Sequence, residues 1–323
     1  MGADMRRLPT NQSIELAERN ALLLALAEYG RTAKGAISPN TERALKADTA
    51  VFTAWCSGQG RQVLPASPDT VADFIDAMAE VKATATVRRY VASIARMHRA
   101  AGLEDPTKDE TAKLALKRMA RKNGVRQRQA APLNRPLVDR MIAAAGDSLR
   151  DKRDVAMLSV QYDTLTRRSE LVALDLEDID FAEDGAGTIT IRRSKTDQEG
   201  EGSIRYLAQD TIEHLAVWLE AAGITEGALF RAVTMGDRVR GRLSDRDVSR
   251  RLKVMAKQAS LDIDPSGHSA RVGVCQDMVA SGFSLPEVMQ AGGWKSPDMV
   301  ARYSEHLQAR QGAAAKLAAI QNR

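Results

Sequence analysis

The chain has only two cysteines, Cys56 and Cys275, among its 323 residues. Two cysteines so far apart in sequence provide neither a disulfide framework nor the spacing of a zinc site, and they fit a reducing compartment. No apolar run approaches the roughly 20 residues that span a bilayer, and the N-terminal segment MGADMRRLPT lacks the apolar centre of a signal peptide. We therefore expect a cytoplasmic protein that does not enter a membrane.

Aromatic residues are also scarce, at 4% of the chain, whereas alanine and leucine are abundant and favour helices. The net charge is only +5, but the positive charge is clustered. Residues 113–128 hold seven Lys or Arg and no acid, and residues 231–253 hold eight against three Asp. Clustered positive charge on helices is typical of a protein that binds nucleic acid.

The order of periodic segments predicts a mainly α protein with two domains. Residues 1–12 form a tail, and helical periodicity then runs through 13–124. Residues 125–134 contain proline and basic residues but no acid, which predicts an extended linker. A mixed α+β, mostly helical domain follows over 135–323, with a small sheet formed by strands near 188–193 and 203–207 and a last helix at about 309–321.

The stretch from Ser266 to Tyr303 carries the most chemical information. It contains a His-x-x-Arg motif, a Gly-Gly-Trp turn and a tyrosine, and two cationic elements precede it, one in TLTRRSEL and one in RRSKTD. The residues concerned are Arg167, Lys195, His268, Arg271, Trp294 and Tyr303. One nucleophile with several phosphate-directed donors predicts phosphoryl transfer to tyrosine without a metal ion.

Elementary chemistry explains each residue type in this pattern. Two arginines can neutralise the charge that grows on the non-bridging oxygens of a phosphate, because a guanidinium offers forked donors and stays charged. A lysine can deliver a proton to the leaving oxygen, and a histidine can accept the proton of the tyrosine. The indole N–H of a tryptophan can donate to the same phosphate.

With these motifs in this order, the chain resembles the tyrosine recombinases, also called the phage integrase family, from about residue 11 onward. The resemblance implies a C-shaped clamp on DNA that exchanges strands at a specific site through 3′-phosphotyrosine links and a Holliday junction. Tyr303 would be the nucleophile, Arg167 and Arg271 would hold the phosphate, and Lys195 would be the general acid. His268, Trp294 and Glu170 would assist, Glu170 by orienting the site.

The same resemblance implies partners. The protein would bind a duplex site with two inverted half-sites as a homotetramer, would be a monomer or weakly associated when free, and would need neither a metal, ATP nor another cofactor. The protein would be encoded by a bacterium, phage or plasmid and would lie in the bacterial cytoplasm, at the nucleoid. Its last helix would dock on the adjacent protomer.

The same resemblance also implies which residues of this chain face DNA. Arg246 resembles a guanine-reading arginine. The other candidates lie on helices of the first domain or in the linker, where cations meet phosphates. They are Thr41, Arg43, Arg88, Arg89, Lys117, Arg121, Lys122, Arg126 and Arg128.

Two features depart from the family pattern. Thr166 precedes Arg167 where an apolar residue is usual, and the lysine turn is acidic, with Asp197, Glu199 and Glu201. Other interpretations stay open: a DNA-binding protein without catalysis, a topoisomerase-like or hairpin-resolving enzyme, an integrase that uses arm sites, and a helical scaffold for acidic partners. A steep salt dependence of DNA binding would separate the last from the others.

Overall fold

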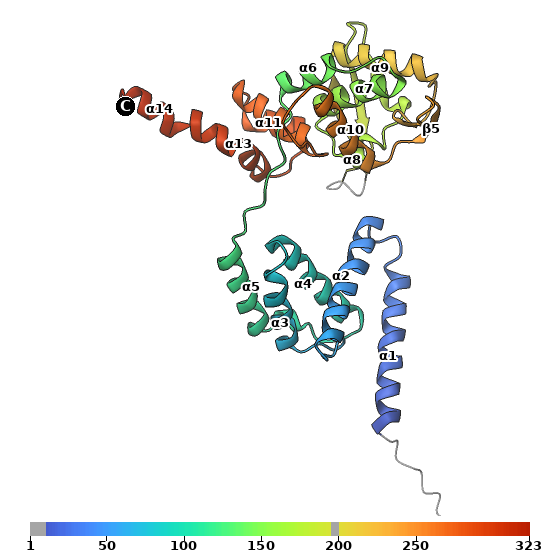
Figure 1. Cartoon of the computed structure of the whole chain (residues 1–323), viewed down its shortest axis with the longest axis vertical. Helices are drawn as coiled ribbons and strands as arrows, with labels where there is room; N and C mark the ends of the chain where they lie inside the picture. Colours follow the sequence, from blue (N-terminus) through green and yellow to red (C-terminus); the bar gives the residue numbers. More distant parts are fainter. Residues whose placement is uncertain (1–10, 195–199) are drawn as a thin grey trace, which may run out of the picture. The chain divides into compact units, whose positions relative to one another are not determined.

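The computed structural model describes residues 11–194 and 200–323, and the chain divides into two compact units, Met1–Arg128 and Gln129–Arg323. Helices dominate both units, and the strands form two small sheets (Figure 1). The predicted mainly α fold with a small sheet is confirmed. No helix in the described ranges is both long and apolar enough to cross a membrane.

Unit 1 is a helical bundle. Its helices are α1 (Asn11–Thr32), α2 (Pro39–Gly58), α3 (Pro68–Ala79), α4 (Thr84–Ala100) and α5 (Glu110–Asn123), with a short 3-10 helix at Pro106–Lys108 before α5. Local chemistry sets the starts: Ser38 and Ser67 each cap a helix that has proline in its first turn, and Asp109 caps α5.

The core of unit 1 is aromatic at its centre. Phe74 on α3 is fully buried and meets the rings of Phe52 and Trp55 on α2 edge to face, at centroid distances of 5.0 and 5.4 Å. Edge-to-face contact is a preferred geometry for such rings. Ile94 on α4 and Met119 on α5 complete this core, so the four helices α2 to α5 close around one apolar centre.

Unit 2 is mixed. Its helices are α6 (Arg135–Ala143), α7 (Leu149–Thr164), α8 (Arg168–Leu171), α9 (Gln209–Ala222), α10 (Asp245–Gln258), α11 (Ser269–Ala280), α12 (Leu285–Gly292), α13 (Asp298–Gln311) and α14 (Ala313–Ile320). Its strands are β1 (Ile179–Phe181), β2 (Gly187–Ile191), β3 (Ser203–Leu207), β4 (Arg231–Val233) and β5 (Val239–Arg242).

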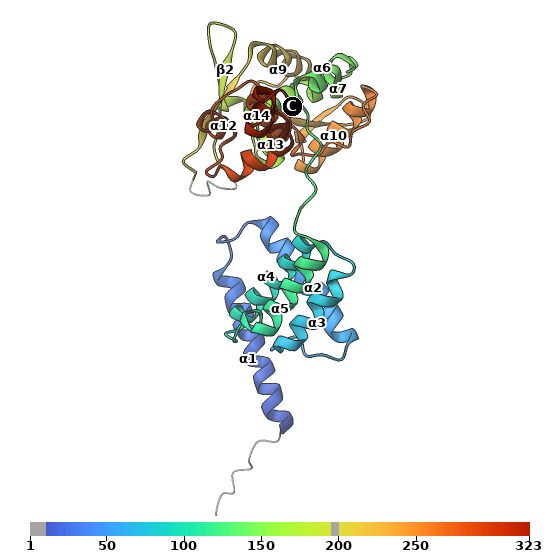
Figure 2. The ribbon, with the colours of Figure 1, turned by 90° about the vertical axis from the view of Figure 1, so that its left-hand side faces the viewer.

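The larger sheet is antiparallel with strand order β1-β2-β3. Its inner face, which includes Ile189 and Leu207, joins the main core of unit 2 around the buried Trp218 of α9. Figure 2 shows α9 beside β2, where the side chain of Ile212 lies against Gly187. Strands β2 and β3 pair up to Ile191 and Ser203, and the predicted lysine belongs to the segment that connects them in the sequence.

Some elements differ from the prediction. Strands β1, β4 and β5 were not predicted, because three or four residues are too few to show an alternating pattern. The helix expected at about 309–321 is divided at Gly312: residues up to Gln311 belong to α13, and α14 covers Ala313–Ile320. Tyr303 lies near the middle of α13.

The chain enters unit 2 directly over α11. The N–H of Leu133 donates to the carbonyl of Ser269 (3.0 Å), and the Leu133 side chain is fully buried. Gly273 on α11 lies beneath this segment, where any Cβ would collide with the backbone of Leu133 and Asn134. This close approach explains the glycine in the SARVG sequence and fixes the helix that carries Arg271.

Candidate active site

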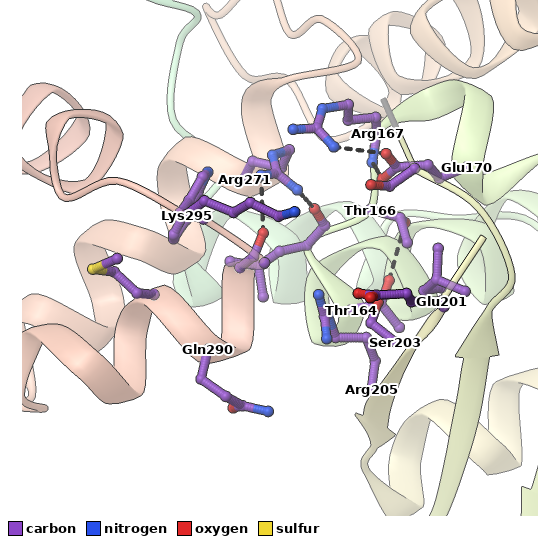
Figure 3. A pocket seen from close by; sticks show the side chains of 18 residues that line it. Thr164, Thr166, Arg167, Glu170, Glu201, Ser203, Arg205, Arg271, Gln290 and Lys295 are labelled. Atoms are coloured by element: carbon purple, nitrogen blue, oxygen red, sulfur yellow. Dashed lines mark hydrogen bonds and ion pairs between the residues drawn. The ribbon is translucent and has the colours of Figure 1, made fainter. Parts of the chain in front are cut away.

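One pocket of about 250 Å³ in unit 2 collects residues from segments far apart in the sequence. Figure 3 shows their side chains around it. The α7–α8 connection, strand β3, helix α11 and the α12–α13 connection all contribute. The lining includes Thr164, Leu165, Thr166, Arg167, Glu170, Glu201, Ser203, Arg205, Arg271, Gln290, Gly292, Gly293, Trp294 and Lys295.

Arg271 is buried, with 3% of its surface exposed. Its guanidinium donates to the carbonyl oxygens of Leu165 and, at 3.1 Å, of Gly292. These bonds tie α11 to both the α7–α8 connection and the end of α12. Burial, together with the nearby charge of Arg167, lowers the pKa of Arg271 to about 10. The group therefore stays charged at neutral pH, while its orientation is fixed by two carbonyls.

Arg167 and Glu170 form a pair at the start of α8. The Glu170 carboxylate accepts from the Arg167 backbone N–H (2.9 Å) and from its guanidinium (2.7 Å). The glutamate is 8% exposed, so it serves as a buried anchor that both caps the helix and aims the arginine. The neighbouring Arg168 is exposed and pairs with Asp245 of α10 (3.2 Å).

The unusual Thr166 has a structural explanation. It is 2% exposed, and its hydroxyl lies 3.0 Å from the hydroxyl of Thr164. Between them, Leu165 adopts a left-handed conformation (φ 51°), which turns its carbonyl toward Arg271. The threonine is thus a buried polar group with a partner, and the turn that it belongs to presents an acceptor to the arginine.

Trp294 and Tyr303 pack against each other beside the pocket. Their rings meet edge to face, with centroids 5.9 Å apart, and the guanidinium carbon of Arg271 lies 5.0 Å from the centroid of Trp294. Trp294 lines the pocket, but Tyr303 does not, and the tyrosine is only 9% exposed. Tyr303 thus packs against Trp294, and Trp294 in turn faces the pocket.

Of the other predicted catalytic residues, His268 does not line the pocket either. His268 occupies the N-cap position of α11, one turn before Arg271, and is exposed. Its backbone N–H donates to the hydroxyl of Ser266 (3.3 Å). Lys195 lies outside the described residues, as do Asp197 and Glu199. Glu201, the last acid of that turn, does line the pocket.

Two pocket cations were missed by our sequence analysis. Arg205 on β3 and Lys295 after the Gly-Gly-Trp turn both line the pocket beside Arg167 and Arg271. A signal for Arg205 was present, because strand alternation places it on the same face as Leu207, which is buried. We predicted that strand correctly but gave no role to its arginine.

The DNA-facing candidates of unit 1 differ in the partners that their side chains have within the protein. Thr41 lies in the first turn of α2, with its hydroxyl 2.9 Å from that of Ser38, and Arg43 is exposed and donates to Asn40 (2.8 Å). On α4, Arg88 is exposed, and Arg89 pairs with the buried Asp48 of α2 (2.8 Å). Arg89 therefore also holds two helices together.

The remaining candidates are exposed. Lys122 pairs with Glu80 (2.6 Å), and Lys117 lies 3.9 Å from Glu110. Such exposed pairs are weak, and a phosphate can displace either carboxylate. Arg121, Arg126 and Arg128 lie at the end of α5 and after it, and Arg246 is exposed in the first turn of α10.

Comparison with known proteins decides the family. The sequence profile of the phage integrase family matches residues 133–310, which is more than half of the 323 residues. The chain belongs to the phage integrase family. The recombinase Cre of Escherichia phage P1 is 30% identical over 303 residues, covering 87% of this chain and 88% of Cre. An integrase/recombinase XerD homolog of Selenomonas ruminantium is 33% identical over 281 residues, covering 82% and 81%.

A solved structure supports the fold of this phage integrase. The lambda integrase dimer bound to a COC′ core site matches it with a TM-score of 0.60 at 14% identity, covering 93% of this chain and 81% of that one. The predicted family is confirmed, and with it the assignment of the chain as a site-specific DNA recombinase. The roles of individual residues remain predictions.

Proposed function

We propose that this phage integrase cuts and rejoins duplex DNA at a specific site through a covalent 3′-phosphate ester of Tyr303. One observation carries the proposal: the guanidinium groups of Arg167 and Arg271 line one pocket, and Tyr303 packs directly behind the Trp294 that faces it. A buried tyrosine next to two oriented guanidinium groups fits nucleophilic attack on a phosphodiester.

In the proposed reaction, the phenol oxygen of Tyr303 forms a bond to phosphorus, and the bond from phosphorus to the 5′ oxygen breaks. The phenol proton goes to His268 or to solvent, and the 5′ oxygen receives a proton from Lys195. The 5′ hydroxyl of another strand then attacks the tyrosine ester and gives its proton to Lys195, while Tyr303 leaves and takes back a proton from His268 or solvent. Each cut is matched by one resealed bond, so the scheme consumes no nucleotide and uses no metal ion.

Arg167 and Arg271 act on the charge that this step creates. The attacked phosphorus carries five oxygens, and its non-bridging oxygens gain negative charge relative to the ground state. Donors that are already oriented stabilise this charge without reorganising. The two carbonyls that hold Arg271 and the carboxylate that holds Arg167 provide that orientation.

The covered position of Tyr303 adds a requirement. The tyrosine is 9% exposed and does not line the pocket, so its oxygen must reach the phosphate by a movement of α13. We propose that binding of the DNA site drives this movement, because only the bound state gains the contacts that can offset the lost Trp294 packing.

We further propose that two copies bind inverted half-sites and that two such dimers exchange strands as a tetramer through a Holliday junction. Exposed apolar residues of α14 support an exchange of this helix between protomers: Leu317 is 50% and Ile320 79% exposed. An eight-residue helix is too short to be stable without a surface to pack against. Arg246, exposed on α10, would read a guanine.

Covalent trapping tests the proposal. The protein is incubated with genomic fragments from its source, denatured, and the DNA that stays attached is sequenced. We expect one enriched site, equal yield with and without a chelator, and no adduct with Tyr303→Phe although binding persists. Tyr206→Phe is the matched control, because Tyr206 is 62% exposed on β3. An adduct that survives Tyr303→Phe would refute the role of Tyr303.

A further inference from the structure

The arginine at position 205 faces the wrong way for a simple amphipathic strand. In β3, the apolar Ile204 and Tyr206 are 64% and 62% exposed, whereas Arg205 points to the inner face with the buried Leu207. Period-two patterning would put the apolar pair inside and the charge outside. An inversion of this kind costs stability, and such violations concentrate at functional sites.

The surroundings of Arg205 provide little compensation for its charge. Its guanidinium donates to the carbonyl of Ile204 (3.0 Å), and no carboxylate among the described residues lies within ion-pair distance. Burial lowers the pKa of Arg205, and the charge of Glu170 acts in the opposite direction. Among the described residues, the carbonyl of Ile204 is the acceptor found for its five N–H donors, which is costly for a half-buried guanidinium without an anion.

The fold makes room for this side chain. Gly293 adopts a left-handed conformation (φ 61°) at the end of α12, and a Cβ at this position would collide with Nη2 of Arg205. Besides burial and Arg167, Arg205 lowers the pKa of Arg271, so the three charges act on one another. Figure 3 shows Arg205 on one side of the pocket, with Arg271 and Arg167 across from it.

The arginines of the pocket, which the exposed Lys295 and Glu201 also line, differ in how their charges are compensated. Arg167 forms an ion pair with Glu170 at 2.7 Å. Of the two guanidinium groups of Arg167 and Arg271, only the buried one of Arg271 is then left without a carboxylate partner. The pentavalent phosphorus carries one more negative charge than the bound phosphodiester. A second uncompensated guanidinium balances that added charge, and Arg205 is placed to supply it.

We propose that Arg205 is a further catalytic residue that donates to a non-bridging oxygen of the phosphate under attack. This inference rests on the proposed function and extends it, since the site then holds the phosphate from β3 as well as from α8 and α11. It also gives the β2–β3 hairpin a second task beside carrying Lys195.

The test uses the full chain and a duplex containing the site found by covalent trapping. Cleavage is followed under single-turnover conditions, and binding is measured by gel shift. We expect Arg205→Ala to lower the cleavage rate about 100-fold, as loss of one oriented donor does, with little change in binding. Arg205→Lys keeps a charge and should lose less. Arg140→Ala is the matched control, because Arg140 is exposed on α6 and does not line the pocket.

A second substrate separates a charge effect from a structural one. It carries a methylphosphonate at the cleaved position, so that one non-bridging oxygen is replaced by a neutral methyl group. If Arg205 neutralises that oxygen, the loss caused by Arg205→Ala falls below about tenfold on one methylphosphonate isomer. An equal loss on both substrates would assign Arg205 a structural role and overturn the proposal.

The outcomes also separate this inference from the proposed function. If the wild type cleaves, Tyr303→Phe does not, and Arg205→Ala cleaves like the wild type, only the role of Arg205 is refuted. If the wild type forms no adduct with any DNA, the proposed function fails and the role of Arg205 fails with it. Circular dichroism of Arg205→Met, which keeps the volume, checks that the variants fold.

Discussion

Trp294 connects the packing of unit 2 to its chemistry, and its replacement by alanine is therefore the most informative perturbation. The side chain is 8% exposed, meets Tyr303 edge to face and lies under Arg271. Removing a buried indole costs about 3–5 kcal/mol, which includes the cavity left behind. Trp294→Phe keeps a ring against both neighbours and should cost about 1–2 kcal/mol.

Urea unfolding measures this difference cleanly in a Trp55→Phe background. The chain has three tryptophans, so the tryptophan fluorescence of the Trp294 variants in this background comes only from Trp218, which is fully buried in the main core of unit 2. With a slope of about 2 kcal/mol per molar urea, Trp294→Ala should lower the midpoint by about 2 M, and Trp294→Phe by less than half as much.

The same pair of variants tests the link to catalysis. Without the indole, Arg271 and Tyr303 each lose a packing surface, and a misplacement of about 1 Å costs about 100-fold in rate. We expect that loss of cleavage for Trp294→Ala and a smaller one for Trp294→Phe. The reasoning is wrong if the two variants have the same urea midpoint, or if Trp294→Ala cleaves at the rate of Trp294→Phe.

Two other predictions concern unit 1 and the C-terminus. His98 is fully buried, accepts from the N–H of Ala66 (2.9 Å), and burial lowers its pKa below 6.5. The unfolded chain then binds a proton that the folded chain does not, so the free energy of unfolding should fall as pH drops below about 6.5, by at most about 1.4 kcal/mol per pH unit. Denaturation at pH 7.5 and 5.5 should show this loss, and His98→Leu should remove the dependence; a wild-type stability independent of pH would contradict it. Deleting residues 313–323, which hold α14, should leave half-site binding in gel shifts unchanged but abolish tetramer formation on DNA, and full recombination by the truncated chain would exclude helix exchange.

Much of the fold could be predicted from the sequence because helices leave local signals. The first turn of α3 has both a serine cap and a proline, and its apolar residues repeat at helical spacing, so local signals predict a helix there. The strand β3 was predicted at Ser203–Leu207, as observed. Strands of three or four residues gave no such signal, and they became visible only through their pairing.

The order of motifs in the sequence was sufficient to determine the family and to single out the tyrosine and the two arginines as candidates, since each motif is local and chemically distinctive. Only the tertiary structure decided which side chains meet. It placed Tyr303 behind Trp294, gave Thr166 a partner in Thr164, and turned Arg205 into the pocket. The physical reason is that the direction of a strand's side chains depends on which face meets the core, and that choice is made by packing between segments far apart in the chain.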